Sequence, residues 1–183
     1  MSKLIICAGF GGQGIMFMGR FLAYSAMKLN YNVTWISSYG AEARGGAAYC
    51  MVVISDDDIP SPLIEHPDVC IVMNSPSFEK FHTRLKKNGL LILNSSLIDD
   101  GRSVRRDITC IKIPMTAMAL SSGNVKVANM LALGAFIFND STFKLGTIQT
   151  LLEQFIPPHR KNLLDANKTA LWEGYEFAKR YKS

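Results

Sequence analysis

Residues 3–14 read KLIICAGFGGQG, a short apolar run that breaks into glycines. The apolar part, Lys3–Ala8, is typical of a buried strand. The stretch that follows, Ile15–Leu29, has apolar residues at steps of three and four, which predicts a helix that stops at Asn30. A second apolar run at Asn32–Ile36 completes a predicted βαβ unit.

The rest of the chain continues this alternation of strands and helices. The segment DDDIPSPLIEHP is too short and too rich in proline for a packed crossover helix, so the strands on either side of it are expected to be antiparallel or distant in the sheet. Together the elements predict an α/β fold: a Rossmann-like three-layer sandwich with a mostly parallel sheet and a C-terminal helix, forming one domain over residues 1–183. The further predicted strands are Ala47–Ser55, Asp68–Met73, Leu90–Leu93 and Thr109–Ile113, and the further helices are Phe78–Lys87, Val125–Phe138, Gly146–Phe155 and Asn162–Tyr181.

Composition narrows the class of protein. Of the 183 residues, 48% are hydrophobic, which is enough for a sizeable core. The first apolar run is too short for a signal peptide or a membrane span, so a soluble, cytoplasmic protein is expected. The net charge of +5 comes from scattered residues, which disfavours nucleic-acid binding and favours an acidic partner or an anionic cofactor.

The residues that most often carry metals or catalysis lie far apart. The four cysteines sit in separate apolar stretches without a CxxC pattern, so buried reduced thiols are expected and no metal or iron–sulfur cluster is assigned to this chain alone. The histidines have no neighbouring nucleophile pattern, and the three consecutive aspartates are interpreted as a solvated turn. No catalytic centre is recognisable. These residues are Cys7, Cys50, Cys70, Cys110, His66, His82, His159 and Asp56 to Asp58.

The glycine turn Gly9–Gly14 fits the pattern GxGxxG between a strand and a helix. Gly11 would let backbone approach a ligand, Gly14 would let the helix pack close to the sheet, and the helix N-terminus favours a phosphate or carboxylate. A dinucleotide site would also need an acid at the end of the second strand, but the first acid there is Glu42, in the following loop. An anionic ligand, a purely structural turn and NAD binding remain open.

A second polar stretch, Tyr39–Gly46, follows the second strand. It should lie at the carboxyl edge of the sheet, next to the first glycine turn, where open α/β sheets bind ligands. The guanidinium of Arg44 could form two parallel hydrogen bonds to a carboxylate or phosphate. Alternatively, Glu42 could simply neutralise the charge of Arg44.

These two stretches, together with ANMLALGA at Ala128–Ala135, resemble the gamma subunit of the pyruvate/2-oxoacid:ferredoxin oxidoreductases, most closely the small separate gamma subunit of the 2-oxoglutarate type. The resemblance spans nearly the whole chain. It implies a complex that oxidatively decarboxylates a 2-oxoacid with coenzyme A, yielding an acyl-CoA, carbon dioxide and reduced ferredoxin or a similar acceptor.

The resemblance also implies partners and cofactors. Thiamine diphosphate and magnesium would belong to alpha and beta subunits, and iron–sulfur clusters to the beta or a ferredoxin-like delta subunit, so this chain would bind none of them alone. Ala41 stands where proline is expected in many relatives. The resemblance carries over cofactor-binding or interface roles to Gly11, Gly12, Gln13, Gly14, Tyr39, Gly40, Glu42, Arg44, Gly45 and Gly46.

Three alternatives stay open at this point. The substrate could be pyruvate or another 2-oxoacid instead of 2-oxoglutarate. The chain could be a stand-alone nucleotide-binding Rossmann protein, or a structural interface subunit that binds no coenzyme A.

Overall fold

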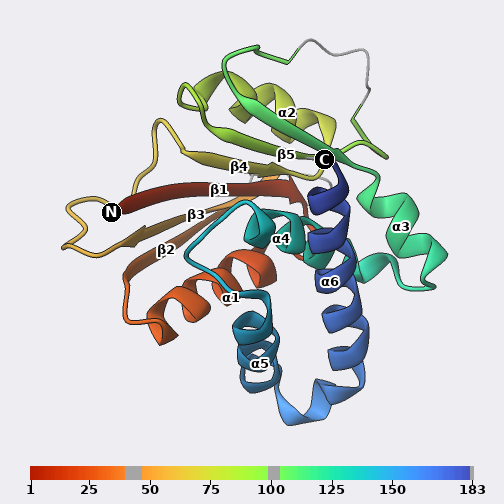
Figure 1. The fold of residues 1–183 in the computed structure, drawn as a ribbon. Helices are drawn as coiled ribbons and strands as arrows, with labels where there is room; N and C mark the ends of the chain where they lie inside the picture. The colour runs from red at the N-terminus through yellow and green to blue at the C-terminus, as the bar shows by residue number, and fades with distance from the viewer. Residues whose placement is uncertain (40–46, 99–103, 182–183) are drawn as a thin grey trace.

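The computed structural model describes residues 1–39, 47–98 and 104–181, and a twisted sheet forms its centre (Figure 1). Within these ranges the sheet has six strands in the order β2-β3-β1-β4-β5-β6. The strands are β1 (Ser2–Phe10), β2 (Asn32–Tyr39), β3 (Ala47–Ser55), β4 (Val69–Val72), β5 (Leu90–Asn94) and β6 (Thr109–Ile113).

One strand runs against the others. β3 pairs antiparallel with β1 on one side and with β2 on the other, whereas β1, β4, β5 and β6 pair in parallel. The prediction of a mostly parallel sheet is confirmed, and so is the expectation for the strands around residues 56–68, since β3 and β4 flank β1 in opposite directions. The βαβ unit is present with a difference: β3 is inserted between β1 and β2, so those two strands share a direction without touching.

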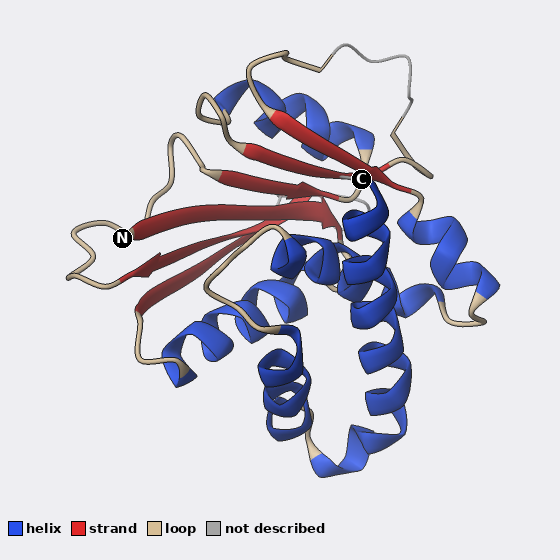
Figure 2. Cartoon of the chain, viewed as in Figure 1, coloured by secondary structure: helices blue, strands red, loops and turns tan. Residues whose placement is uncertain are grey.

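Helices cover the two faces of the sheet unequally (Figure 2). α1, α4, α5 and α6 pack on one face, and α2 with a 3₁₀ turn covers the other, which confirms the three layers. No helix in the described ranges is long and apolar enough to cross a membrane. The helices are α1 (Ile15–Lys28), α2 (Ser75–Phe81), α3 (Met115–Ser121), α4 (Ala128–Phe138), α5 (Leu145–Phe155) and α6 (Leu164–Tyr181), and the 3₁₀ turns are His82–Arg84, Val125–Val127 and Pro158–Leu163.

α4 lies between the sheet and α6, and all its residues except the last are buried. The two helices approach closely at a pair of glycines. A Cβ at Gly134 would stand 2.0 Å from the carbonyl oxygen of Leu171, and a Cβ at Gly174 would stand 2.0 Å from that of Leu131. Only glycine permits backbones to come this close, so this contact fixes how α6 is rotated on α4.

The sequence predicts an apolar stripe on the last helix, and the structure confirms the middle of that stripe but not its ends; its expected members are Leu163, Ala166, Ala170, Gly174, Phe177 and Tyr181. Steps of three and four from residue 163 to residue 181 put Leu163 and Tyr181 at the ends of the apolar stripe, yet both are exposed. The buried residues of α6 are Ala170, Leu171, Gly174 and Ala178, the first and third of which belong to the expected stripe. Ala166 and Phe177 of the stripe are half-buried against the core.

α2 begins and ends earlier than predicted. Asn74 caps it, because its Oδ1 accepts a hydrogen bond from the backbone N–H of Ser77 at 2.9 Å. Pro76 stands in the first turn, where its missing N–H costs nothing. α3 was not expected at all, because its seven residues are too few to show a periodic pattern.

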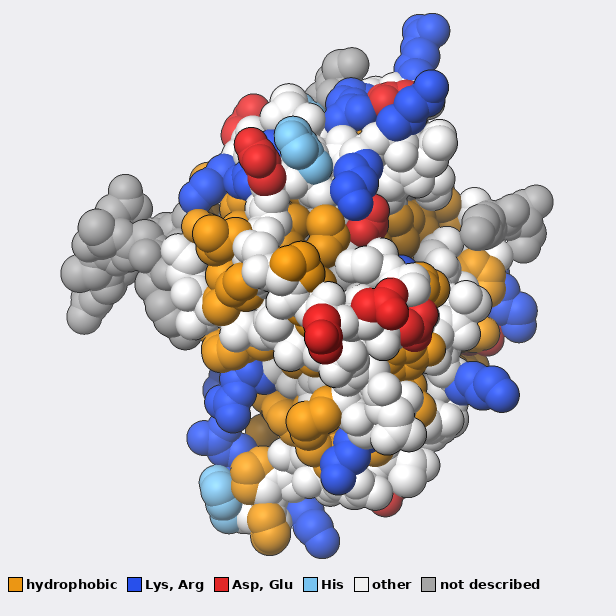
Figure 3. Space-filling model, turned by 90° about the vertical axis from the view of Figure 1, so that its left-hand side faces the viewer, with side chains coloured by type: hydrophobic (Ala, Val, Ile, Leu, Met, Phe, Trp, Pro, Cys, Tyr) orange, Lys and Arg blue, Asp and Glu red, His pale blue; other side chains and the backbone are white. Residues whose placement is uncertain are grey.

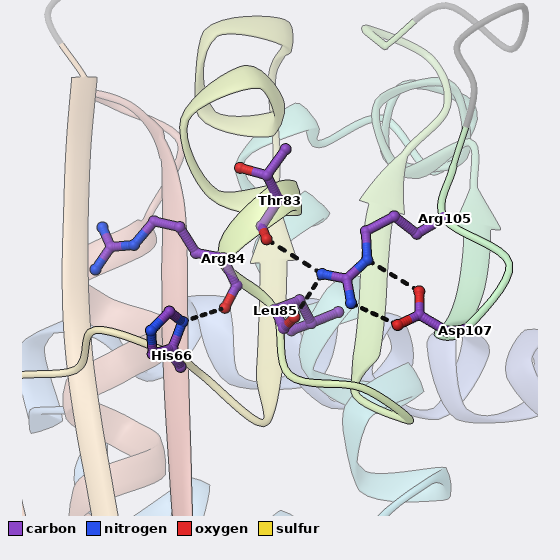
Figure 4. A network of polar contacts seen from close by, with 6 residues as sticks. All are labelled: His66, Thr83, Arg84, Leu85, Arg105 and Asp107. Carbon is purple, nitrogen blue, oxygen red and sulfur yellow. Dashed lines mark hydrogen bonds and ion pairs between the residues drawn. The ribbon is translucent and has the colours of Figure 1, made fainter.

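Arg105 connects two loops at the amino-terminal edge of the sheet (Figure 4). Its guanidinium donates to the carbonyl oxygens of Thr83 and Leu85 at 3.1 and 2.6 Å, and it forms a two-pronged ion pair with Asp107. The hydrogen bonds from Arg105 lower the pKa of the Asp107 carboxyl. The arginine thus joins the turn after α2 to the segment that enters β6.

Candidate functional site

The turn Gly9–Gly14 lies at the carboxyl end of β1, as predicted. The backbone N–H of Phe10 donates to Oε1 of Gln13 at 2.7 Å, and Nε2 of Gln13 reaches the carbonyl oxygen of Met73 at 3.4 Å. Gln13 therefore holds the turn closed and ties it to the end of β4.

The glycines of this turn have separate reasons to be there. Gly12 and Gly14 have φ values of 95° and 73°, a region that other residues enter only at a cost. A Cβ at Gly11 would meet nothing within 4 Å, which agrees with open space for a ligand or partner. A Cβ at Gly14 would stand 2.5 Å from Nδ2 of Asn129 in α4. The close neighbour of Gly14 is thus α4, and the expectation that it is the sheet is wrong.

A cavity of about 500 Å³ opens beside this turn, between the first turns of α1, the start of α4 and the segment after α5. One wall is apolar and partly aromatic, and Phe17 and Phe155 meet there edge to face with ring centroids 5.4 Å apart. The rest of the lining is polar or cationic. The described residues that line the cavity are Gly12, Gly14, Met16, Phe17, Arg20, Asn124, Lys126, Val127, Asn129, Phe155, Ile156, Pro157, Arg160, Leu163 and Asn167.

The electrostatics of the cavity favour an anion. Arg20, Lys126 and Arg160 line it, and no acidic side chain is among the described lining residues. The 14-residue helix α1 begins at the cavity, and its N-terminus adds partial positive charge. Charge of one sign around a partly enclosed space focuses the field on an anionic ligand.

Asn129, which lines the cavity, has a buried side-chain atom that is not hydrogen-bonded. The residue is only 3% exposed, and its Nδ2 donates to the carbonyl oxygen of Gly14 at 3.1 Å. Its Oδ1 has no hydrogen-bond partner in the described structure. Buried polar atoms are nearly always paired, so this oxygen indicates a missing donor.

The second predicted stretch is only partly described. Tyr39 ends β2 and pairs with Ala48, while Phe10 at the end of β1 pairs with Ala47 at the start of β3. The described residues on either side of the stretch therefore lie at the same sheet edge as the glycine turn. The candidate residues Gly40, Glu42, Arg44, Gly45 and Gly46 lie outside the described residues.

The topology bears on the dinucleotide alternative. In a dinucleotide-binding βαβ unit the second strand lies beside the first and presents its acid to the ribose. Here β3 separates β2 from β1, so the end of β2 is displaced from the glycine turn by one strand. This arrangement argues against an NAD site of that type.

The other candidate residues have structural partners. None of the four cysteines forms a disulfide: Cys7, Cys50 and Cys70 are buried as expected, but Cys110 is only half-buried because its strand lies at the sheet edge. A hydrogen bond between the opposed thiols raises the pKa of Cys7 and lowers that of Cys50, and burial raises the pKa of Cys70 to about 12. Asp56 forms an ion pair with the amino terminus at 2.6 Å. In the described ranges, no three metal-binding side chains gather.

Positively charged side chains do not form one continuous patch on the face of the molecule drawn in Figure 3. On the face drawn in Figure 3, Lys and Arg side chains stand in separate groups with acidic side chains between them. The sequence suggested scattered charge, and this face agrees. What the sequence missed is the gathering of Arg20, Lys126 and Arg160 around one cavity; the signal available was Asn129, a polar residue inside an otherwise apolar helix.

Comparison with known proteins gives the family. The family model "Pyruvate ferredoxin/flavodoxin oxidoreductase" matches residues 4–177. The 2-oxoglutarate synthase subunit KorC of Methanocaldococcus jannaschii is 33% identical over 98% of this chain and 95% of its own length. The ketoisovalerate oxidoreductase subunit VorA of Methanothermobacter marburgensis is 29% identical over 94% of this chain, which covers 36% of that longer protein.

Comparison with solved structures also finds gamma subunits of oxoacid oxidoreductases. The gamma subunit of a keto/oxoacid ferredoxin oxidoreductase from Geobacter sulfurreducens superposes with a TM-score of 0.82 at 25% identity, covering 97% of this chain and 99% of its own. A 2-oxoglutarate:ferredoxin oxidoreductase from Magnetococcus marinus, solved with 2-oxoglutarate, coenzyme A and succinyl-CoA, shares the fold with a TM-score of 0.88; 98% of this chain matches 31% of that one. The resemblance to gamma subunits is thus confirmed, and the chain belongs to the pyruvate ferredoxin/flavodoxin oxidoreductase family.

Proposed function

We propose that this chain is the gamma subunit of a multisubunit 2-oxoglutarate:ferredoxin, or similar acceptor, oxidoreductase. The complex converts 2-oxoglutarate and coenzyme A to succinyl-CoA and carbon dioxide while reducing the acceptor. The observation that carries this proposal is the full-length similarity to a 2-oxoglutarate synthase subunit, which extends over 98% of this chain and 95% of the relative.

In this proposal the chain is one gamma-type domain over residues 1–183, and the chemistry takes place with its partners. Alpha and beta subunits carry thiamine diphosphate and magnesium, and iron–sulfur clusters belong to the beta or a ferredoxin-like delta subunit. The four cysteines lie on separate strands and form no disulfide, which supports reduced thiols in the cytoplasm and gives no ligand set for a cluster.

The carboxyl edge of the sheet faces the partner subunits. Gly11, which has open space beside it, and Tyr39, which ends β2, mark this edge. Arg44, which follows Tyr39 by five residues, is the residue we assign to an anionic group of a partner or of coenzyme A. Arginine suits this role because its planar fork matches a carboxylate or phosphate.

The cavity beside Gly14 fits a bound anionic cofactor of this kind. Its cations suit phosphates, and its apolar wall suits an uncharged arm. Coenzyme A, when bound, supplies the thiol that accepts the acyl group; the residues of this chain bind and orient it.

The first test is affinity purification of the tagged chain from its native anaerobic extract, followed by an assay of viologen reduction that depends on both a 2-oxoacid and coenzyme A. Co-purification of a thiamine-binding pair with 2-oxoglutarate activity is expected. A chain that purifies alone, without such activity, would contradict the proposal.

The same assay separates the alternative substrates. The similarity to a ketoisovalerate oxidoreductase subunit supports branched-chain 2-oxoacids as the second candidate. The complex should therefore be assayed with 2-oxoglutarate, pyruvate and 2-ketoisovalerate, and turnover that clearly favours either of the last two would replace the leading substrate.

Arg44 can be tested in the reconstituted complex. Arg44→Ala should leave the fold intact and lower assembly or activity by about tenfold or more, as expected for loss of a charged hydrogen-bonding group. Arg106→Ala, which removes an exposed arginine just before the amino-terminal end of β6, is the matched control. Full activity of Arg44→Ala would remove this residue from the proposed site.

A further inference from the structure

We infer that Cys7 and Cys50 form a reversible oxidation site, at which a small oxidant of the peroxide class joins the two thiols as a disulfide between β1 and β3. The inference is separate from the proposed function, because that function assigns no role to either thiol. It can therefore be tested on the full chain without partner subunits.

The two cysteines face each other across neighbouring strands. Cys7 on β1 is the direct antiparallel partner of Cys50 on β3, and both side chains are buried on the side of the sheet that α1 covers. Directly opposed residues of an antiparallel pair have Cα atoms about 4.5–5.5 Å apart, and a disulfide spans about 4.4–6.8 Å between Cα atoms. The bond can therefore form without moving the strands apart.

The other two cysteines lack this geometry. Cys70 and Cys110 belong to the opposite face of the sheet. They lie on β4 and β6 with β5 between them, since both are register partners of Leu91. Two strand spacings amount to about 9–10 Å, which is beyond the reach of a disulfide. Among the four cysteines, Cys7 and Cys50 are thus the pair that can close an internal disulfide.

The two thiols differ in reactivity. The hydrogen bond between them lowers the pKa of the Cys50 thiol, against the opposite effect of burial, and the Trp35 indole lowers that pKa further. The same hydrogen bond, together with burial, raises the pKa of Cys7. The thiolate is the form that attacks an oxidant. Cys50 is therefore the attacking sulfur, and Cys7 is the sulfur that resolves the intermediate.

The reaction needs one peroxide molecule and no other reagent. The Cys50 sulfur attacks one oxygen of hydrogen peroxide, the O–O bond breaks, and Cys50 becomes a sulfenic acid as the first water leaves. The Cys7 sulfur then bonds to the Cys50 sulfur, and the sulfenic hydroxyl leaves with the Cys7 proton as the second water. Two electrons pass from the sulfurs to the peroxide, so two thiols and one peroxide give one disulfide and two waters.

Burial decides which oxidants reach the pair. Both cysteines are 0% exposed, and α1 lies directly on them, because a Cβ at Gly19 would stand 2.2 Å from Sγ of Cys50. Oxidation thus requires a brief local opening of α1. Such an opening admits hydrogen peroxide more readily than oxidised glutathione, whose own sulfur would have to reach the Cys50 thiolate. The site therefore selects small peroxides over bulky disulfides.

The test treats the reduced full chain with hydrogen peroxide, blocks the remaining thiols with iodoacetamide in urea and maps the cysteines by peptide mass spectrometry. A disulfide between the peptides that contain Cys7 and Cys50 is expected, and dithiothreitol should restore both thiols. Cys70 should keep its thiol, because burial raises its pKa to about 12. Oxidised glutathione at the same concentration should form the bond at least about tenfold more slowly.

Two variants separate the roles of the sulfurs. Cys7→Ser should stop the reaction at a sulfenic acid on Cys50, which dimedone traps, whereas Cys50→Ser should give neither the disulfide nor a trapped sulfenic acid on Cys7. Cys70→Ser, which removes a buried thiol from the other face of the sheet, is the matched control and should form the disulfide at the wild-type rate. The wild-type measurement needs no substitution, so it decides the inference even where a variant fails to fold.

Three results would overturn the inference. One is that peroxide leaves Cys7 and Cys50 as thiols in the folded chain while it oxidises them in urea. Another is a disulfide that joins other cysteines, or two chains, in place of this pair. The last is an equal rate with peroxide and with oxidised glutathione, which would remove the assigned class of oxidant. The proposed function is judged separately, by turnover of the wild-type complex with 2-oxoglutarate.

Discussion

Replacing Gly134 by alanine should destabilise the protein strongly, although a change from glycine to alanine usually stabilises a helix. In an ordinary helix interior, alanine is favoured over glycine by about 1 kcal/mol. Here the added Cβ would stand 2.0 Å from the carbonyl oxygen of Leu171 and 2.8 Å from the backbone N of Tyr175, whereas Cβ contacts below 3.0 Å are essentially never seen. Both neighbours are backbone atoms of α6, so no side-chain rotation can relieve the contact.

The magnitude follows from the separation that the helices must undergo. To bring the shortest contact to 3.0 Å, α4 and α6 must move apart locally by about 1 Å, and a gap of that size forfeits a quarter to a half of the dispersion energy across it. Overpacking typically costs about 1–3 kcal/mol, and the upper end applies because the obstacle is backbone. We expect a loss of about 3 kcal/mol, which for a chain of this size lowers Tm by roughly 6–12 °C.

Urea unfolding of the full chain, followed by circular dichroism, measures this loss. Gly146→Ala in α5 is the matched control, because a Cβ there would meet nothing within 4 Å, so this variant should be as stable as the wild type or slightly more stable. If Gly134→Ala were as stable as Gly146→Ala, the close approach of α4 and α6 would be refuted.

Three further predictions concern charge and thiols. Lys3→Met should cost about 3 kcal/mol in urea unfolding because it leaves the buried carboxylate of Asp140 without its ion-pair partner, and adding Asp140→Asn should recover part of that loss; no recovery would mean that the pair contributes little. The pKa of Asp107 is lowered in the folded state, so the stabilisation from Arg105 is present above the ordinary aspartate pKa and lost as pH falls through the folded value. Arg105→Gln should thus be less stable than wild type near about pH 7, with the difference shrinking below about pH 4, and a constant difference would contradict this assignment. With a thiol pKa of about 12, Cys70 should resist iodoacetamide near about pH 8 in the folded chain and react in urea, as peptide mass spectrometry can measure; rapid labelling of the folded chain would show that the site opens.

The sequence predicted the strands better than the helices, for a physical reason. Ala47–Ser55 and Thr109–Ile113 have the predicted limits because each is a short apolar run bounded by glycine or proline, a signal contained in the run itself. The apolar stripe of α6 was right at Ala170 and Gly174, but the sequence did not show that α4 and α6 approach most closely at Gly134 and Gly174, which are 40 residues apart. Spacing within one helix carries no record of such a contact.

In the candidate site, too, the sequence revealed the residues of a local pattern and missed those that the fold brings together. Gly14 was identified from its pattern, and its positive φ confirms the need for glycine. Lys126 and Arg160 were not identified, because they come from separate elements that the fold brings to one cavity. A charged residue in a loop looks like ordinary solvated surface until its neighbours are known.

The position of α4 has a consequence for how the protein is made. This helix is apolar on nearly all sides, and one of its sides is covered by α6, which comes later in the sequence. A ribosome releases residues in order, so a nascent chain that already holds the whole sheet must carry α4 uncovered until residues 164–181 have emerged. Packing of this layer is therefore completed only after residues 164–181 have emerged, and the growing chain is most prone to aggregation or chaperone capture in the interval before that.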